Sequence, residues 1–340
     1  MDQKDINFPG VSIIIPVLNN ERTIKKCLEG ITLQDYPKNK VEVLILDGGS
    51  TDKTIAIAKS FRSINLHIVK GGYRNNMEAR RSIGFRKAKY NLVLVLDSDN
   101  YLYSSDSLRK LVKPMLGEDH LIGSFTLHYH YDSQLPFFTR YISLFGNHDP
   151  VAYYLHKADR QKITQKTWPH KNQIVSTKPE WTVVQFNKQN FPTLGSNGFL
   201  INKKYLRLKN LKPENFLHTD ILYDLLDRGL NKYAVVDAQV VHDSSSSIKR
   251  HLEKRYEYMQ LHHISLAKIR RYKVFDSNSP QDRFHLTKFI FYTITIVKPL
   301  HESIEGFFKK PDLAWFIHPF LCWAFLITYS FAVVNPHKKR

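Results

Sequence analysis

The first hundred residues alternate short aliphatic runs with segments of helical pattern, and this alternation constrains the fold more than any other feature. The runs at residues 11–16 and 92–96 are bounded by polar or turn-forming residues, which is typical of strands buried on both faces of a sheet. Residues 41–46 and 66–69 are expected to form two further strands. Between them, helical patterns are expected over residues 19–31, 51–59 and 77–88. This order predicts a doubly wound α/β domain with right-handed crossovers.

Two carboxylates follow the fourth aliphatic run. Asp97 and Asp99 stand two positions apart in the sequence Leu96-Asp97-Ser98-Asp99-Asn100. Ligands of open α/β sheets gather beyond the carboxyl ends of the strands, where two such carboxylates can face one hard divalent cation. The same residues also suit a turn that caps the next element. The pattern by itself leaves both interpretations open.

The composition favours a folded protein with an anionic partner. The chain has 340 residues, 42% of them hydrophobic, and 50 Lys and Arg against 31 Asp and Glu give a net charge of +19. Such an excess suits phosphate-bearing substrates, an anionic membrane surface or nucleic acid. No nucleic-acid motif is recognisable. Cys27 and Cys322 lie too far apart in sequence for a zinc pattern, and the amino terminus lacks a secretory signal pattern, which favours a reducing, cytosol-facing location.

The carboxyl-terminal region contains apolar segments that suggest a membrane. Residues 313–334 carry no formal charge and are flanked by Lys309-Lys310 and Lys338-Lys339-Arg340. This length suffices to cross the hydrocarbon of a bilayer, although a buried core helix or a re-entrant hairpin also fits. Residues 284–297 are apolar but short and interrupted by Lys288, so we expect an interfacial helix there.

Four segments in order resemble the inverting glycosyltransferases of family 2, which have the GT-A fold. They are IIIPVLNNERTI, LDGGSTDKT, EARRSIGFRKA and LVLDSDN, and the resemblance extends over roughly residues 9–256. It implies a nucleotide-sugar donor and a divalent metal, Mn²⁺ or Mg²⁺. It also implies donor-binding roles for residues of these segments, namely Pro16, Asn19, Glu21, Asp47, Arg80 and Asp97. Gly48 and Gly49 replace an acidic residue that is frequent in relatives. For Arg81, Arg86 and Lys87 we expect a solvated basic helix face.

Downstream segments extend the resemblance to the reacting centre. Asn197 and Gly198 belong to a glycine-bearing segment that relatives place beneath the donor sugar. Thr219-Asp220 stands where relatives carry Glu-Asp, which implies that Asp220 is the general base; the alternative is a helix cap. The resemblance adds His242 to Asp97 and Asp99 as a metal ligand, with a surface histidine as the alternative. Arg255 stands where processive relatives carry the arginine of Gln-x-x-Arg-Trp, which implies a donor-binding role for it. The missing Gln and Trp favour addition of single sugars.

The remaining segments carry weaker patterns. Residues 127–131 and 233–241 are expected to form strands, and residues 255–273 a basic helix. The aromatic segment 135–145 fits a core helix, an acceptor-site wall or a membrane-surface segment. His128, His130 and His148 lack metal-ligand spacing.

These patterns together predict a membrane-associated, metal-dependent inverting glycosyltransferase with its catalytic domain on the cytoplasmic side. Residues 1–100 form the nucleotide-sugar-binding half, 101–250 the acceptor-binding half, and 251–340 the carboxyl-terminal helices with a probable membrane segment at 313–334. The expected donor is a UDP-sugar, or else a GDP-sugar, and the acceptor a hydroxyl of a lipid-linked or membrane-proximal glycan. A polyprenyl-phosphate sugar synthase is one alternative, and a non-catalytic basic protein that binds lipid or nucleic acid is another.

Overall fold

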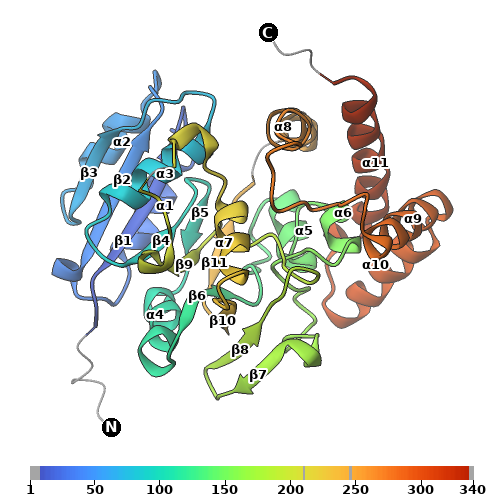
Figure 1. Cartoon of the computed structure of the whole chain (residues 1–340), viewed down its shortest axis with the longest axis horizontal. Helices are drawn as coiled ribbons and strands as arrows, with labels where there is room; N and C mark the ends of the chain where they lie inside the picture. Colours follow the sequence, from blue (N-terminus) through green and yellow to red (C-terminus); the bar gives the residue numbers. More distant parts are fainter. Residues whose placement is uncertain (1–7, 210, 245–246, 337–340) are drawn as a thin grey trace. The chain divides into compact units, whose positions relative to one another are not determined.

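The computed structural model describes residues 8–209, 211–244 and 247–336, which form two compact units (Figure 1). The first unit takes in the chain up to His130 together with Trp168–Lys188 and Leu194–His242. The second contains Tyr131–Thr167, Gln189–Thr193 and the chain from Asp243 onward. The predicted basic flank at 338–340 lies outside the described residues. The division into donor, acceptor and carboxyl-terminal ranges concerns function, and it stays a prediction.

The first unit is built on a nine-stranded sheet, as far as the described residues go. Its strand order is β3-β2-β1-β4-β9-β6-β10-β8-β7. The strands are β1 (Val11–Val17), β2 (Val41–Asp47), β3 (Leu66–Lys70), β4 (Leu92–Val95), β6 (Leu121–Thr126), β7 (Ile174–Thr177), β8 (Trp181–Gln185), β9 (Phe199–Asn202) and β10 (Lys232–Val236). The four amino-terminal strands pair in parallel, whereas β9 runs antiparallel to both β4 and β6. The sheet is therefore mixed, and the predicted α/β class is confirmed.

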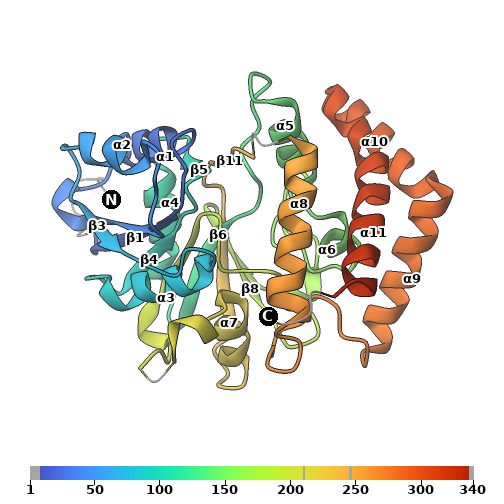
Figure 2. The same ribbon diagram turned by 90° about the horizontal axis from the view of Figure 1, so that it is seen from above.

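Helices cover both faces of the parallel part of this sheet (Figure 2). Apolar side chains of α1 (Ile24–Thr32), α2 (Thr54–Ser60) and α4 (Ser107–Gly117) share one core with alternate residues of β1, β2 and β4. On the other face α3 (Met77–Lys87) lies close to the sheet. A Cβ atom at Gly84 would lie 2.5 Å from Leu46 Cδ1, so glycine permits this approach. The first unit also contains the helix α7 (His218–Leu226).

Proline is tolerated inside β1, which continues one residue beyond the predicted run at 11–16. The strand continues to Val17, which pairs with Asp47. The carbonyl of Ile14 accepts a hydrogen bond from the backbone N–H of Leu96, so the backbone groups of Ile14 point toward β4. The backbone nitrogen of Pro16, two residues later, points to the same side. The pairing of β1 with β4 ends at Ile14 and Val95. The backbone N–H that proline lacks is therefore not needed for a hydrogen bond between these strands.

The segment expected as one strand over 233–241 is instead two strands in different sheets. After β10 the chain breaks its pairing at residues 237–239 and then forms β11 (Val240–His242). This strand pairs antiparallel with β5 (Asn100–Leu102), which follows the Asp97–Asp99 turn. The expectation of a single strand was wrong because β11 and its partner β5 have only three residues each and leave no periodic signal.

The predicted strand over residues 127–131 was also wrong. The chain turns after β6, and the hydroxyl of Thr126 donates to the carbonyl of His128 at 2.9 Å. The backbone N–H of Leu127 then donates to the carbonyl of Val236, and the backbone N–H of His130 donates to the carbonyl of Val240. The alternation read from the sequence reflects a turn with one buried aromatic, Tyr129.

The second unit is helical in its described residues. Its helices are α5 (Phe137–Phe145), α6 (Pro150–Tyr154), α8 (Ile248–Tyr258), α9 (Pro280–Thr295), α10 (Val297–Lys309) and α11 (His318–Val334). The aromatic segment 135–145 provides α5, whose side chains are mostly buried, as expected of a core helix. The helix expected over 255–273 widens into a π-helical segment at Met259–Ile264 and ends there. A short 3₁₀ segment, Leu313–Ile317, precedes α11.

Candidate active site

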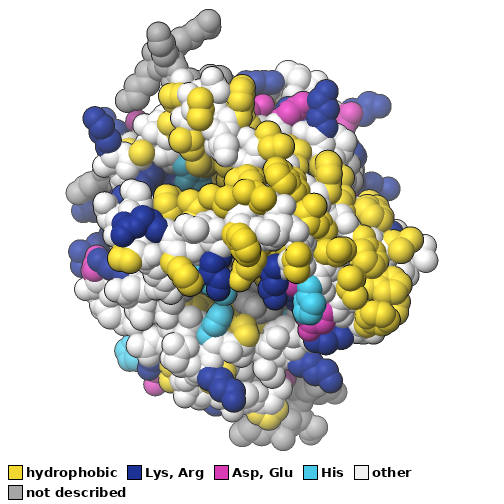
Figure 3. Space-filling model, turned by 90° about the vertical axis from the view of Figure 1, so that its right-hand side faces the viewer, with side chains coloured by type: hydrophobic (Ala, Val, Ile, Leu, Met, Phe, Trp, Pro, Cys, Tyr) yellow, Lys and Arg dark blue, Asp and Glu magenta, His cyan; other side chains and the backbone are white. Residues whose placement is uncertain are grey.

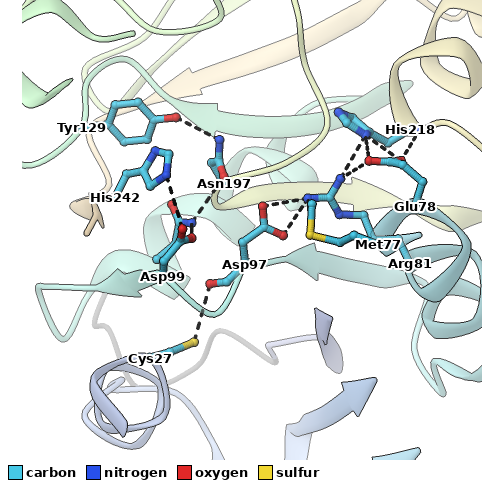
Figure 4. Close-up of polar contacts among 11 residues, drawn as sticks. Cys27, Met77, Glu78, Arg81, Asp97, Asp99, Tyr129, Asn197, His218 and His242 are labelled. Atoms are coloured by element: carbon cyan, nitrogen blue, oxygen red, sulfur yellow. Dashed lines mark hydrogen bonds and ion pairs between the residues drawn. The ribbon is translucent and has the colours of Figure 1, made fainter. Parts of the chain in front are cut away.

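The Asp-x-Asp turn lies directly after β4 in the first unit. The backbone N–H of Asn100 donates to the carbonyl of Asp97 at 2.9 Å, which closes the turn. The two carboxylates then point to different partners, Asp97 toward Arg81 and Asp99 toward His242 (Figure 4). The side chain of Asp99 is the more exposed of the two, at 34% against 16%. Asp99 is therefore the carboxylate more accessible to a ligand.

The pairing of β5 with β11 brings His242 to this turn. The register sets His242 opposite Asn100, the residue after Asp99. As a result His242 Nε2 lies 3.8 Å from Asp99 Oδ2. A strand pairing between residues about 140 positions apart thus unites two of the three residues predicted to bind metal.

The glycine-bearing segment before β9 reaches the same turn. Asn100 Nδ2 donates to Asp99 Oδ1 at 2.7 Å and to Asn197 Oδ1 at 3.3 Å, and Asn197 Nδ2 donates to the Tyr129 hydroxyl at 3.2 Å. Asn197 and Gly198 have positive φ angles of 55° and 82°. A Cβ atom at Gly198 would lie 2.9 Å from Val240 on β11, so glycine is required for this close packing.

Arg81 connects Asp97 to the rest of the site. It is only 2% exposed, and its Nη2 donates to both carboxylate oxygens of Asp97 at 2.7 Å. Its Nη1 donates to Glu78, one turn earlier on α3. The expectation of a solvated basic face was therefore wrong for Arg81, although Arg86 and Lys87 are exposed as expected. Sequence reasoning missed Arg81 because one of its two partner carboxylates, Asp97, lies on another element.

Glu78 extends this network to the helix that carries Asp220. It accepts a hydrogen bond from the backbone N–H of His218 at 2.9 Å and contacts His218 Nδ1 at 2.8 Å. His218 begins α7, and Asp220 lies in the first turn of that helix with 2% of its surface exposed. The ring of His218 packs against Gly195, where φ is +118° and a Cβ atom would lie 2.7 Å from Cδ2. The beginning of α7 is thereby fixed from two sides.

The loops after β1 and β2 hold each other by reciprocal hydrogen bonds. Asn19 Oδ1 accepts from the backbone of Thr51 at 2.9 Å, and Glu21 Oε2 accepts from the backbone of Lys53 at 3.0 Å. Asp47, at the end of β2, accepts from the backbone of Ser50 at 2.9 Å. The predicted donor-binding residues Asn19, Glu21 and Asp47 therefore lie in one loop pair at the carboxyl ends of parallel strands.

Arg80 lies behind these loops. Its Nη1 donates to the carbonyls of Tyr73 and Arg74 at 2.7 and 2.9 Å. Burial and the neighbouring Arg81 cation lower the pKa of its guanidinium. A Cβ atom at residue 48 would lie 2.7 Å from Arg80 Nη1, so Gly48 lets the guanidinium approach the turn after Asp47. This contact gives a structural reason for glycine at the position where relatives often carry an acid.

The donor set fits a divalent cation that shares its coordination with a substrate. Mg²⁺ and Mn²⁺ sites of this kind use one or two carboxylates together with phosphate oxygens and water. Asp99 and His242 supply an oxygen and an imidazole nitrogen 3.8 Å apart. Among the described residues, no group of three or more His, Cys, Asp or Glu side chains is placed so that it could hold a metal ion. The residues present therefore suit a cation completed by ligand atoms better than one held by protein alone.

Arg255 belongs to the second unit. Its Nη2 donates to Asp149 Oδ2 at 2.8 Å and to the Tyr329 hydroxyl at 2.9 Å. Tyr329 also donates to Asp149, so the three side chains form a closed cluster. The predicted role of Arg255 in donor binding stays a prediction.

Two curated relatives resemble part of this chain. The glycosyltransferase AglE from Haloferax volcanii is 41% identical over 94 residues, which cover 27% of this chain and 31% of that protein. A dolichyl N-acetyl-α-D-glucosaminyl phosphate 3-β-D-2,3-diacetamido-2,3-dideoxy-β-D-glucuronosyltransferase from Methanococcus voltae is 54% identical over 57 residues, 17% of each chain. The matched stretch thus spans less than a third of the length of either relative.

The fold also matches a solved structure. The mannosyltransferase PcManGT from Pyrobaculum calidifontis, in complex with GDP-Man and Mn²⁺, superposes with a TM-score of 0.52 at 13% sequence identity. The match covers 96% of this chain and 88% of that one. This likeness shows the GT-A fold predicted from the sequence. Residues 12–181, half of the chain, match the family described as Glycosyl transferase family 2. The chain therefore belongs to glycosyltransferase family 2.

Proposed function

We propose that this protein is a metal-dependent inverting glycosyltransferase that moves one sugar from a nucleotide-diphosphate sugar to an acceptor hydroxyl. The observation that carries the proposal is the meeting of Asp99, His242 and the Asn197 turn beyond the end of β4. These groups come from three separate parts of the chain, and each is of the type that a sugar diphosphate with its cation requires. Family membership supports the same reaction class.

The donor is proposed to lie across the carboxyl ends of β1, β2 and β4. Pro16 lies near the end of β1, and the loop that follows it, with Asn19 and Glu21, is hydrogen-bonded to the loop after Asp47 as described above. A carboxylate at Asp47 suits the N–H of a uracil or guanine base or the hydroxyls of a ribose, and we favour a UDP-sugar. Arg80 supplies a fixed positive charge behind this loop pair, which favours the anionic donor.

Asp99 and His242 would hold the cation, with Asp97 next to them. When bound, the cation would neutralise the charge that develops on the leaving nucleoside diphosphate. Mn²⁺ suits the imidazole and carboxylate pair somewhat better than Mg²⁺. Asp97 has both oxygens held by Arg81, so its carboxylate is fixed in orientation before a ligand arrives. Asn197 and Gly198 would approach the sugar from the neighbouring turn.

Asp220 is proposed as the general base. It would accept the proton of the acceptor hydroxyl while that oxygen attacks the anomeric carbon from the face opposite the diphosphate. The new glycosidic bond forms as the bond to the diphosphate oxygen breaks, so the anomeric configuration inverts. The position of Asp220 in a buried first helical turn, fixed through His218 and Glu78, supports this role because a base must be held within hydrogen-bonding reach.

For the acceptor we propose a hydroxyl of a lipid-linked or membrane-proximal glycan. The name of the Methanococcus voltae relative describes transfer to a dolichyl-phosphate-linked sugar, although the likeness covers only 17% of that protein. Residues 313–334 have the length and apolar composition needed to cross a membrane, which supports membrane association. We propose that the catalytic unit faces the cytoplasm, where nucleotide sugars are available.

The anomeric configuration of the product tests this proposal. Purified full-length protein is incubated with a panel of UDP- and GDP-α-linked sugars, Mn²⁺ and a lipid-linked oligosaccharide, and the product is examined by NMR spectroscopy. We expect one donor to give a β-linked product with a single added sugar. An α-linked product would contradict the inverting mechanism, and a sugar linked to the lipid phosphate would identify a polyprenyl-phosphate sugar synthase instead.

A further inference from the structure

Three helices of the second unit each expose an apolar stripe. The exposed apolar side chains recur every three or four residues on α10 and on the segment 313–334, and seven and three residues apart on α9, so each stripe follows one side of its helix. We call these stripes together the apolar face. Figure 3 shows hydrophobic side chains gathered on the side of the molecule that carries these helices. Representative members are Phe284, Phe291, Ile304, Phe308, Phe320 and Ile327.

An apolar surface of this extent is unusual on a soluble monomer. The face carries several exposed phenylalanines, and Phe308 is 80% exposed. Contiguous exposed patches larger than a few hundred Å² mark sites that bind a protein, a ligand or a membrane. The face is therefore expected to be covered by a partner.

The opposite side of α11 belongs to the folded interior of the second unit. The helix packs against α6, α8, α9 and α10. Its inner side makes polar contacts along its whole length. His318 contacts the hydroxyls of Tyr141 and Tyr154 at 3.0 and 3.1 Å, and Tyr329 donates to Asp149 at 2.5 Å. Near the end of the helix, Gln260 Nε2 donates to the Ala332 carbonyl at 2.9 Å.

These contacts conflict with a spanning orientation of α11. The neighbouring helix α8 has the sequence IKRHLEKRYEY, whose charges cannot accompany α11 into hydrocarbon without a large cost. Removing α11 from its neighbours would instead leave the hydrogen-bonding groups of His318, Tyr329 and Gln260 unsatisfied. A helix whose inner side is packed and hydrogen-bonded to its own unit, and whose outer side is apolar, satisfies both requirements when it lies flat at an interface.

The charges around the apolar face indicate which kind of partner covers it. Across residues 280–334 the basic side chains Arg283, Lys288, Lys298, Lys309 and Lys310 all reach the surface. Three of the four acids, Asp282, Glu302 and Asp312, are largely buried and hold hydrogen bonds inside the unit. The fourth, Glu305, pairs with Lys309 at 2.6 Å. The rim is therefore cationic, and it would repel the same rim of a second copy but attract anionic headgroups.

We propose that the apolar face binds an anionic lipid bilayer in the plane of one leaflet, and that residues 313–334 lie in this interface without crossing the bilayer. The inference deepens the membrane association given under the proposed function. The phenylalanines would enter the boundary between headgroups and acyl chains, to a depth of about 5–10 Å, while the lysines contact lipid phosphates. The protein would thus be held on the surface where a lipid-linked acceptor presents its glycan.

Binding to vesicles tests the surface. Full-length protein is sedimented with liposomes of phosphatidylcholine alone or with 30% phosphatidylglycerol (about one lipid in three, enough for a clear anionic potential). We expect stronger binding to the anionic vesicles and at least about tenfold weaker partitioning for the Phe308→Asp/Phe320→Asp variant. Leu33→Asp is the matched control, since Leu33 is an exposed leucine on the first unit, and it should bind as the wild type does. Equal binding by all three proteins would refute the assigned face.

The depth of Trp323 distinguishes the flat from the spanning orientation. This residue lies on the outer side of α11 and is the eleventh of the 22 residues in 313–334. In a spanning helix it would lie near the bilayer centre, about 15 Å deep. In a flat helix it would lie just below the headgroups. Quenching by lipids brominated near the headgroup should exceed quenching by lipids brominated near the chain end, with Trp323→Phe providing the background. The reverse order would overturn the proposal.

Three further outcomes remain distinguishable. A lipid-free dimer that the Phe308→Asp/Phe320→Asp variant abolishes, without vesicle binding, would assign the face to a second copy and refute the lipid proposal. Because sedimentation and quenching need no sugar transfer, vesicle binding by a protein that transfers no sugar would overturn the proposed function alone. Transfer to a soluble acceptor by a protein that binds no vesicles would overturn the lipid proposal alone.

Discussion

Arg81 Nη2 lies 2.7 Å from both carboxylate oxygens of Asp97, and the same guanidinium donates through Nη1 to Glu78. Glu78 in turn accepts from the backbone N–H of His218, the first residue of α7. A continuous series of polar contacts therefore links the Asp-x-Asp turn to the helix that carries Asp220. These contacts hold Asp97, proposed for the donor side, and the helix that carries Asp220, proposed for the acceptor side, in fixed positions relative to each other.

Replacing Arg81 by lysine should slow the reaction more than it weakens donor binding. Lysine keeps a charge but lacks the planar fork that contacts Asp97 and Glu78 together. We expect kcat to fall by about 10²-fold, because misplacing a reacting group by about 1 Å has an effect of that size. Steady-state kinetics should show a much smaller change in the donor KM.

The control for this variant is Arg86→Lys, an exposed arginine on the same helix. It should leave kcat and the melting temperature unchanged. A purely structural role for Arg81 would appear as a lower melting temperature with normal kcat in the folded fraction, and that result would contradict the positioning role.

Asp220→Asn should abolish transfer while donor affinity stays nearly intact. The amide cannot accept the acceptor proton, and loss of a general base typically lowers the rate by about 10²–10⁴-fold. Calorimetry with the nucleoside diphosphate and single-turnover kinetics measure the two quantities separately. Asp227→Asn, on an exposed carboxylate at the end of α7, is the control and should be fully active. An Asp220→Asn enzyme with normal turnover would point to an ionised phosphate acceptor, which needs no base.

Replacing Gly195 by alanine should destabilise the protein more than replacing Gly229 by alanine. Residue 195 has φ of +118°, and an added Cβ would meet His218 at 2.7 Å and Leu222 at 2.9 Å. At Gly229 φ is +68°, and nothing lies within 4 Å. We expect Gly195→Ala to lower the free energy of unfolding by about 1–3 kcal/mol more than Gly229→Ala, because strain and overlap add. Chemical denaturation of both variants measures the difference, and equal losses would show that the His218 contact relaxes freely.

Much of the first unit follows from the aliphatic runs. The runs at 11–16, 41–46 and 92–96 correspond to β1, β2 and β4, which are buried and therefore apolar throughout. The run at 66–69 corresponds to the edge strand β3, whose residues are half-buried or exposed. The strands β5 and β11 escaped this reasoning, since three residues carry no period. Their pairing sets His242 beside Asp99, a contact that the family resemblance suggested and that no spacing within the sequence contains.

Arg81 shows why the rest of the site could not be predicted from the sequence. Its helix reads as basic and solvated because Arg80, Arg81, Arg86 and Lys87 crowd a short stretch. The feature that buries Arg81 is a partner set on other elements, Asp97 at 16 positions and His218 at 137 positions along the chain. Local pattern cannot report such partners, because charge pairing at that separation exists only in the folded chain.

Acid should destabilise the second unit through Glu302. Burial favours a raised pKa for this carboxyl, but the hydrogen bond with His318 and the Lys162 cation hold the pKa well below its usual value of 4.5. The ionised form is therefore stabilised in the folded state. This contribution is present above pH 4.5 and is lost as the pH falls below it. Lys298 and the hydroxyls of Tyr153 and Tyr154 also face the carboxylate.

The Glu302→Gln variant isolates this contribution. At pH 7 it should be less stable than the wild type by on the order of 1–3 kcal/mol, the range for hydrogen bonds to charged groups. Below pH 4.5 the difference should shrink. Glu305→Gln, on an exposed carboxylate of the same helix, serves as the control. Urea unfolding at several pH values gives the comparison, and a difference that does not change with pH would contradict the assigned linkage.

Binding of the nucleotide sugar in the presence and absence of metal tests the central claim most directly. Calorimetry on the wild type, Asp99→Asn and the surface control Asp119→Asn would use UDP- and GDP-sugars with Mn²⁺, Mg²⁺ or EDTA. We predict that one donor binds the wild type and the control only with metal, and that Asp99→Asn weakens this binding at least about tenfold. Metal-independent donor binding that Asp99→Asn leaves unchanged would contradict the assignment of this turn as the metal and donor site.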